Sequence, residues 1–201
     1  MEPGTNASPE MGPPASLLAT GPILGDGIHL GDLSAGMHGF TPAYGTVLAE
    51  AATVCLEEEQ HTSGVAMKVT GTHELSVSLA WSCATEQQRR NWADPREATE
   101  YGAIACAILV ARKLTGLQVT GQARKGTGFD WWLGAEPDAA GPFQNLARME
   151  VSGIRKGDEA AIRMRVNQKQ QQTTQSDATT SLPAWAVVVE FGGPQTRAVQ
   201  R

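Results

Sequence analysis

The sequence has few of the residues that stabilise small secreted or zinc-bound domains. Its 201 residues include three cysteines, Cys55, Cys83 and Cys106, and no CxxC pair, so neither a disulfide framework nor a zinc site is expected. The four histidines have no HxxxH or HxH spacing, which disfavours a histidine metal site. Aromatic residues make up only 5% of the chain. A chain of this length can still bury a sizeable core without cross-links or structural metal.

Long apolar runs and a targeting signal are also missing. No apolar run approaches the roughly 18 residues that a membrane-spanning helix needs. The N-terminus shows no basic segment followed by an apolar one, as a signal peptide would. We therefore expect a cytoplasmic protein with no membrane contact, consisting of one domain or of one domain with a small appendage.

Charge is distributed unevenly along the chain. The net charge of −5 argues against a wholly basic nucleic-acid-binding surface. Residues 1–91 carry ten acidic and three basic side chains, whereas residues 92–201 carry eleven acidic and thirteen basic ones. A polyanionic partner is therefore expected to meet the C-terminal half, and a protein partner could dock on the acidic N-terminal half.

The N-terminal part divides into a tail and an extension. Residues 1–35 are rich in Gly, Pro, Ser and Ala and are expected to form a disordered or irregular tail. Within residues 36–91, helical spacing predicts a helix from Pro42. Alternating apolar residues predict two strands, 65–69 and 75–81, that form a hairpin. Together these elements form a helix–hairpin extension.

Residues 92–201 are expected to form the main domain, and their first element has the clearest signals. Asp94 is followed by proline and then by Glu97, which is typical of a helix start. The apolar run 98–114 ends in basic residues before Gly116, which is typical of a helix end. A helix that is apolar on most sides is expected to lie against a sheet.

The rest of this domain alternates between strands and one helix. Strands are predicted at 117–124, 128–133 and 145–154, a helix at 158–172, and a last strand at 184–191. The last strand is continuously apolar, as in a sheet covered on both faces. The fold class is therefore α/β, with a mixed central sheet of about four to six strands and helices on both faces.

Two carboxylates interrupt apolar strands of this domain. Asp130 lies between Phe129 and Trp131, and Glu150 lies between Met149 and Val151. Burying a carboxylate among apolar residues is costly unless it is paired or binds a cation. If the two strands are neighbours, the two carboxylates repel, which raises a proton affinity or recruits a divalent ion. Their oxygens suit Mg²⁺ or Mn²⁺.

This pattern resembles the PD-(D/E)xK nuclease superfamily, whose fold is called restriction-endonuclease-like. The resemblance rests on Gly128-Phe129-Asp130 and Glu150-Val151-Ser152-Gly153, and on the order helix, three strands, helix, strand over about residues 94–191. It implies Asp130 and Glu150 as metal ligands, with the main-chain carbonyl of Val151 as a further ligand. A glutamate of the first helix often joins them; we take Glu100, with Glu97 as the alternative.

The sequence departs from this family at the lysine that normally stands two residues after the glutamate. Ser152 occupies that position and cannot supply the positive charge that stabilises the developing negative charge. Some relatives take the lysine from elsewhere, including the second helix. Lys169 in the predicted second helix is our candidate for a catalytic role beside Asp130 and Glu150, and Lys125 is the alternative.

The resemblance implies a metal-dependent nuclease that hydrolyses phosphodiesters, DNA rather than RNA, in a restriction or antiviral defence system. The residues expected to contact the nucleic acid are Arg148, Arg155, Lys156, Arg163, Arg165 and Gln170. The missing lysine favours an alternative, a catalytically inactive nuclease-fold scaffold or interaction subunit. A small-molecule enzyme on an unrelated α/β fold is a third hypothesis, and a homo-oligomer is compatible with the sequence.

Overall fold

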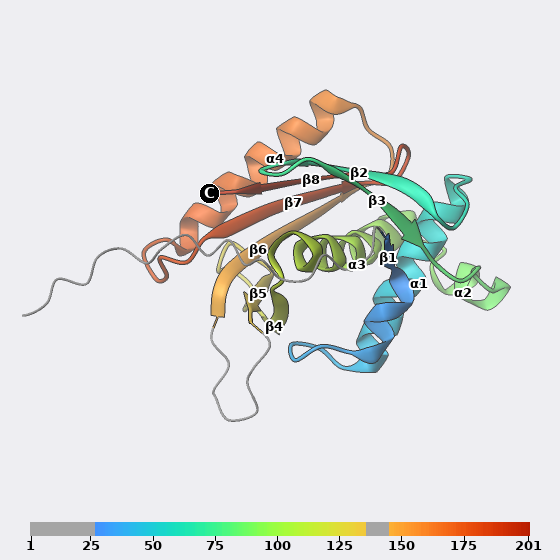
Figure 1. Ribbon diagram of the computed structural model, residues 1–201, viewed down its shortest axis with the longest axis horizontal. Coiled ribbons are helices and arrows are strands. Elements are labelled where there is room, and N and C mark those ends of the chain that lie inside the picture. Colours follow the sequence, from blue (N-terminus) through green and yellow to red (C-terminus); the bar gives the residue numbers. More distant parts are fainter. Residues whose placement is uncertain (1–26, 136–144) are drawn as a thin grey trace, which may run out of the picture.

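The chain folds around one mixed β-sheet, as seen in a computed structural model that describes residues 27–135 and 145–201 (Figure 1). The sheet has eight strands in the order β1-β3-β2-β8-β7-β6-β5-β4. The strands are β1 (Gly27–His29), β2 (Val65–Gly71), β3 (Leu75–Ala80), β4 (Gln118–Gln122), β5 (Trp131–Gly134), β6 (Asn145–Ile154), β7 (Ala184–Glu190) and β8 (Gln195–Gln200). The helices are α1 (Pro42–Glu58), α2 (Glu86–Asn91), α3 (Pro95–Thr115) and α4 (Glu159–Thr173), with short 3-10 helices at Leu30–Ala35 and Thr174–Ser176. The predicted α/β class with a mixed sheet is confirmed.

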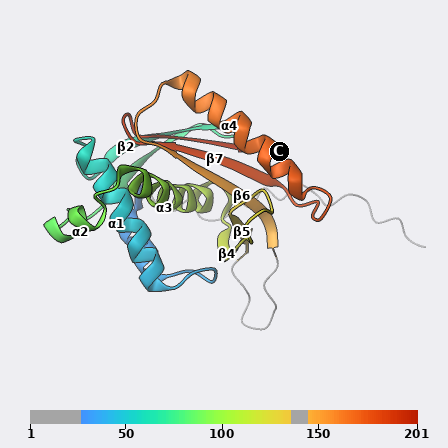
Figure 2. The same cartoon turned by 180° about the vertical axis from the view of Figure 1, so that it is seen from behind.

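Helices cover the sheet on both faces (Figures 1 and 2). The main core lies between the sheet and the pair α1–α3, whereas α4 packs on the other face through Ile162 and Val166. All seven residues of β7 are buried, as expected for a strand covered on both sides. Within the described parts of the chain, no helix is both long enough and apolar enough to cross a membrane.

Local signals explain where the two core helices begin and how closely they pack. The Thr41 side chain caps α1 by accepting a hydrogen bond from the Tyr44 N–H, and the Asp94 side chain accepts from the first turn of α3. Gly116 ends α3 in the left-handed conformation, as predicted. A side chain at Gly102 would begin 3.0 Å from the Ala52 Cα, so this glycine permits close α1–α3 packing.

The prediction that the chain's last strand is 184–191 is wrong, because β8 follows it after a glycine-rich turn. β8 runs antiparallel to β7 and parallel to β2. It thereby joins the β2–β3 hairpin to the rest of the sheet, which has eight strands instead of the expected four to six. The helix and hairpin of residues 36–91 consequently share one core with residues 92–201.

The N-terminal prediction extends beyond the described residues. Residues 27–35 form β1, which pairs parallel with β3, and a 3-10 helix that the His29 side chain caps. The remainder of the expected tail, residues 1–26, lies outside the described residues, as do residues 136–144 between β5 and β6.

Candidate functional site

The site begins where β6 extends beyond the end of its neighbour β5. Strand β5 pairs with β6 only as far as Met149. The next residue back along the chain, Asp130, donates its N–H to the Met149 carbonyl over 3.0 Å, and its Oδ2 accepts from the Val151 N–H over 2.8 Å. The Asp130 side chain therefore continues the hydrogen-bond ladder by one step, and beyond it the edge of β6 is open to a cleft.

Strand alternation directs the Val151 carbonyl toward this open edge. The main-chain groups of Arg148 and Ile154 bond toward β7 and the residues beside it. Successive residues of a strand point their main-chain groups to opposite sides. The carbonyl of Val151 therefore faces away from β7, on the side where Asp130 lies, as the resemblance requires of a ligand.

Helix α4 meets β6 with a matching spacing. Lys169 Nζ lies 2.6 Å from Glu150 Oε1, and Arg165 donates to Ser152 Oγ over 2.9 Å. Four residues of a helix rise about 6 Å, and two residues of a strand rise about 6.6 Å, so the two pairs stay in step. The structure thus brings Asp130, Glu150 and Lys169 together, although Lys169 is on a different element from the other two.

The Glu150 carboxyl lies in an environment that disfavours its charge. The residue is 5% exposed. The pKa of Glu150 is raised to about 7: burial is the largest cause, the Asp130 charge and hydrogen bond also raise it, and Lys169 opposes these effects. A buried carboxyl with a raised pKa, in contact with a second carboxyl and a lysine, is frequent at functional sites.

A cleft of about 820 Å³ opens beside this group. Its walls come from the first turns of α3, from the second half of β6 and from α4. The charged residues that line it are Arg96, Glu100, Asp130, Arg155, Arg165 and Lys169. Gly153 allows β6 to approach α3, since a side chain there would begin 2.5 Å from the Thr99 carbonyl oxygen. Of the two strand carboxyls, Asp130 lines the cleft and Glu150 does not, and the lining has more cationic than acidic side chains.

Of the other candidates, Glu100 lines the cleft, whereas Glu97 and Lys125 do not. Glu100 lines the cleft and is exposed. Glu97 is exposed and outside the cleft lining, and its N–H donates to Asp94. Lys125 is also exposed and outside the lining. Of the two lysines considered, only Lys169 reaches the carboxylates.

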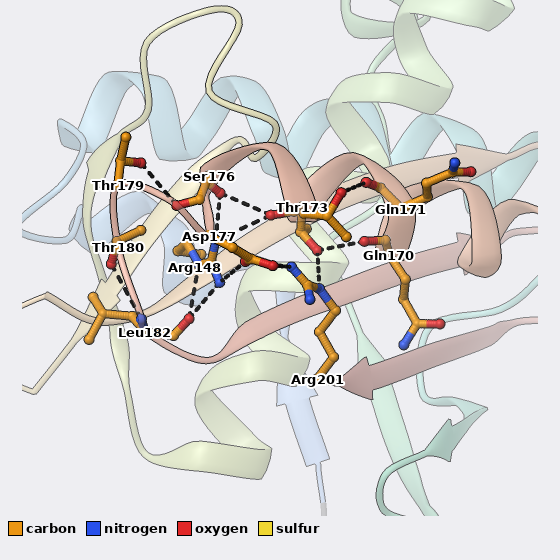
Figure 3. Close-up of polar contacts among 11 residues, drawn as sticks. Arg148, Gln170, Gln171, Thr173, Ser176, Asp177, Thr179, Thr180, Leu182 and Arg201 are labelled. Carbon is orange, nitrogen blue, oxygen red and sulfur yellow. Dashed lines mark hydrogen bonds and ion pairs between the residues drawn. The ribbon is translucent and has the colours of Figure 1, made fainter.

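Arg148 is a correction to the expected nucleic-acid surface. It is 3% exposed, and its guanidinium makes hydrogen bonds with all of its N–H groups (Figure 3). The acceptors are the carbonyls of Thr173 and Leu182, the Ser176 hydroxyl and the Asp177 carboxylate. An arginine has five N–H donors, so none is left for a phosphate. Arg148 therefore ties β6 to the segment after α4.

Other residues of the expected surface are divided among three places. Arg165 lines the cleft, whereas Arg163 and Gln170 line a second groove, of about 550 Å³, on the other side of α4. Arg155 pairs with Glu58 and Glu59 and is only partly available at the cleft. Lys156 pairs with Glu59 over 2.8 Å.

The acidic run 57–59 is therefore an internal contact and not a solvated helix end. Glu57 accepts from the Trp81 indole and pairs with Arg89, while the next two glutamates hold the turn after β6. The expectation that acidic residues of the N-terminal half receive a protein partner does not extend to this run, because these carboxylates already have partners.

The donor set at the β6 edge fits a hard divalent cation. The contacts with the Val151 N–H and with Lys169 use Asp130 Oδ2 and Glu150 Oε1, so a second oxygen remains on each carboxylate for the other carboxyl or for a cation. Carboxylate and carbonyl oxygens suit Mg²⁺, which usually keeps several waters. Within residues 27–135 and 145–201, no three His, Cys, Asp or Glu side chains gather closely enough to form a metal site by themselves.

Two cleft residues were not identified from the sequence as parts of the site. Arg96 lies in the first turn of α3, where its only sequence signal is its place beside the helix cap. Ser152, which was regarded only as a missing lysine, holds Arg165. The four-residue spacing between Lys169 and Arg165, which was already expected to contact nucleic acid, is the signal that could have placed Arg165 beside Ser152.

Compared with known proteins, the chain matches no family model, and no curated protein or solved structure shows significant similarity to it.

Proposed function

We propose that this protein is a metal-dependent nuclease whose reaction centre is formed by Asp130, Glu150 and Lys169. The observation that carries the proposal is the contact of Lys169 with Glu150, beside Asp130, at the open edge of β6. The order α3–β4–β5–β6–α4–β7 supports a restriction-endonuclease-like core, since it is the order of elements in that superfamily.

Asp130 and Glu150 would hold one Mg²⁺ or Mn²⁺ ion together with the Val151 carbonyl. Such an ion polarises a phosphoryl oxygen and lowers the pKa of its bound water. A cation also removes the repulsion between the two carboxylates, which is one cause of the raised pKa of Glu150. In the apo protein Lys169 partly performs this neutralisation.

Lys169 takes the role of the absent family lysine. Its ammonium lies at the wall of the cleft, where it can stabilise negative charge on a phosphate and donate a proton. Arg96 and Arg165 line the same cleft, and neither forms a salt bridge within the described residues. They would bind the phosphates on either side of the scissile one.

The test is cleavage of nucleic acid by the full chain in Mg²⁺ and in Mn²⁺. Plasmid DNA, linear duplex DNA, single-stranded DNA and RNA are offered in parallel, since DNA is the expected substrate. Asp130→Asn and Glu150→Gln keep the shape of each side chain and remove its charge, and both are expected to abolish cleavage. Lys169→Met keeps the length of the side chain and is expected to lower the rate by about 10²–10³-fold.

Matched controls carry the same substitutions away from the cleft. Asp32→Asn and Lys68→Met change exposed residues outside the cleft lining and are expected to leave cleavage unchanged. Lys125→Met separately tests the alternative lysine. Equal activity of wild type, Asp130→Asn and Glu150→Gln would overturn the proposal, because the activity would then come from elsewhere or from a contaminant.

The alternative function, a catalytically inactive scaffold, is favoured by one observation. Glu150 already forms an ion pair with Lys169, whose Nζ lies 2.6 Å from Oε1. If a calorimetric titration shows no Mg²⁺ or Mn²⁺ binding that depends on Asp130, this ion pair is structural and the inactive alternative holds.

A further inference from the structure

The outward face of α4 has an unusual composition for an exposed helix. Its exposed side chains from the second turn onward are Arg163, Met164, Asn167, Gln168 and Gln171. No acidic residue occurs between positions 160 and 176. A helix face that is merely solvated is normally laced with oppositely charged pairs, and this one has none.

These side chains are the types that read base pairs in DNA. Asparagine and glutamine amides both donate and accept, as the edge of adenine does, and an apolar side chain can contact the thymine methyl group. Met164 is 68% exposed, an unusually open position for a large apolar residue. The residues 163, 164, 167, 168 and 171 are spaced so that they lie on one side of the helix.

Cations lie along both edges of this face. Arg165 and Lys169 border the cleft on one side, and Arg163 borders the second groove on the other. Arg197 also lines that groove, and so does one acidic residue, Glu74, from the turn between β2 and β3. Arg197 is held by Glu159 and Thr70, but Arg163 has no ion-pair partner within the described residues. Two rows of phosphates, one on each side of a major groove, would meet this arrangement with opposite charge.

Helix α4 is also free to enter a groove. It is the one described helix on its side of the sheet, and its main contacts are with β6, β7, β8 and the following 3-10 turn (Figures 1 and 2). Its 15 residues span about 22 Å. The major groove of B-form DNA, about 12 Å wide, admits an α-helix, whereas the deep and narrow major groove of A-form RNA does not.

We propose that α4 is a recognition helix that lies in the major groove of duplex DNA. This inference rests on the proposed function. The DNA strand that passes along the Arg165–Lys169 edge of α4 is the one that reaches Asp130 and Glu150. Asn167, Gln168 and Gln171 face the base edges, and Arg163 contacts a phosphate of the opposite strand. The substrate is therefore duplex DNA in preference to duplex RNA or single strands.

The first experiment measures binding alone, by fluorescence anisotropy of the full chain in EDTA. Duplex DNA, duplex RNA and single-stranded DNA of one sequence serve as probes. Duplex DNA is expected to bind most tightly. Arg163→Gln is expected to reduce by about one the slope of log affinity against log salt concentration, because one phosphate contact is lost.

The second experiment compares one substitution on two helices. Gln168→Glu places a negative charge on the α4 face and is expected to weaken duplex binding by about tenfold and to change the sequences selected from a random duplex pool. Gln87→Glu makes the same change at an exposed position of α2 and is expected to leave affinity unchanged. Circular dichroism verifies that both variants are folded.

Each outcome separates this inference from the proposed nuclease. Binding of duplex DNA that depends on α4, without cleavage, supports the inference and contradicts the nuclease. Cleavage that responds to Asp130→Asn but not to Gln168→Glu supports the nuclease and overturns the inference. The inference is likewise overturned if the wild-type chain binds no duplex DNA, or if duplex RNA binds as tightly.

Discussion

Arg148 and Glu150 are buried charges on the same face of the same strand, yet their surroundings differ. Arg148 donates all of its N–H groups to neighbouring oxygens, whereas Glu150 has Lys169 on one side and a second carboxyl, Asp130, on the other. The first is a completed structural contact. The second keeps a raised pKa, which indicates a group that still lacks a sufficient counter-charge.

The difference follows from where β5 ends. Opposite Arg148, Trp132 still pairs with β6, and the segment after α4 closes over the guanidinium. Opposite Glu150, β5 has ended and the Asp130 side chain replaces its backbone. One strand thus carries a sealed buried charge and, two residues later, a buried charge beside a cleft.

The largest expected loss of stability is that of a variant at the buried Arg148. Arg148→Met is expected to lower the free energy of unfolding by about 3–5 kcal/mol, because it leaves buried oxygens without donors. Urea denaturation measures the loss. Arg165→Met is the control, since it removes one hydrogen bond at the cleft and should cost only about 1 kcal/mol. Similar losses in both variants would remove the contrast between the two regions.

The next effect concerns the pH dependence of Glu150. Its pKa is raised from 4.5 to about 7 in the folded state, so folding binds a proton in this range. The contribution of Glu150 to stability is complete below pH 4.5 and is lost as pH rises toward 7. The free energy of unfolding of Glu150→Gln, relative to that of wild type, is therefore expected to be higher at pH 8 than at pH 4.5, by on the order of 1–3 kcal/mol. Urea denaturation at the two pH values measures it. If the difference in unfolding free energy between the two proteins is the same at both pH values, the pKa of Glu150 is not raised by folding.

A pair of glycines tests whether the contact between the Gly128 turn and the end of α4 helps to position Asp130. Gly126 and Gly128 both have positive φ, but only at Gly128 would a side chain collide, 2.3 Å from the Gln172 carbonyl oxygen. Gly128→Ala is expected to cost about 1–3 kcal/mol more than Gly126→Ala and to lower cleavage by moving Asp130. Equal losses in thermal unfolding would mean that this contact does not position the site.

The smallest expected effect comes from Lys169→Met. At pH 8 the variant loses the partner of an ionised carboxylate and is expected to be about 1 kcal/mol less stable than wild type. At pH 5 Glu150 is protonated, and the loss should nearly vanish. The pKa of Glu150, followed by carbon-13 NMR of labelled glutamate, should rise above its wild-type value. An unchanged pKa would contradict the ion pair.

Three of the four described α-helices and most strands could be predicted because their signals are local; the short helix α2 was not predicted. The Asp94 cap and Gly116 delimit α3 to within one residue of its ends. The β8 strand was missed since its six residues are mostly polar and its pairing with β2 joins positions more than 120 residues apart. Such long-range pairing has no local pattern.

The approach of Asp130, Glu150 and Lys169 agrees with what the family resemblance implied, whereas burial was predicted less well. Arg148 and the glutamates 57–59 looked like solvated charges because a count of charges does not show which ones another element covers. Strand alternation does place Arg148 on the face of Glu150, and α4 then covers both residues.

The stepwise match between α4 and β6 makes the position of the lysine in space independent of its position in the chain. In the superfamily that the sequence resembles, the lysine stands on the strand; here the ammonium beside Glu150 comes from a helix. The same geometry makes the arrangement sensitive to the helical spacing between Arg165 and Lys169. A single residue inserted after Val166 would turn Lys169 by about 100° around the helix axis and leave Arg165 in place. Such an insertion would disconnect the two cations without altering the composition of the helix.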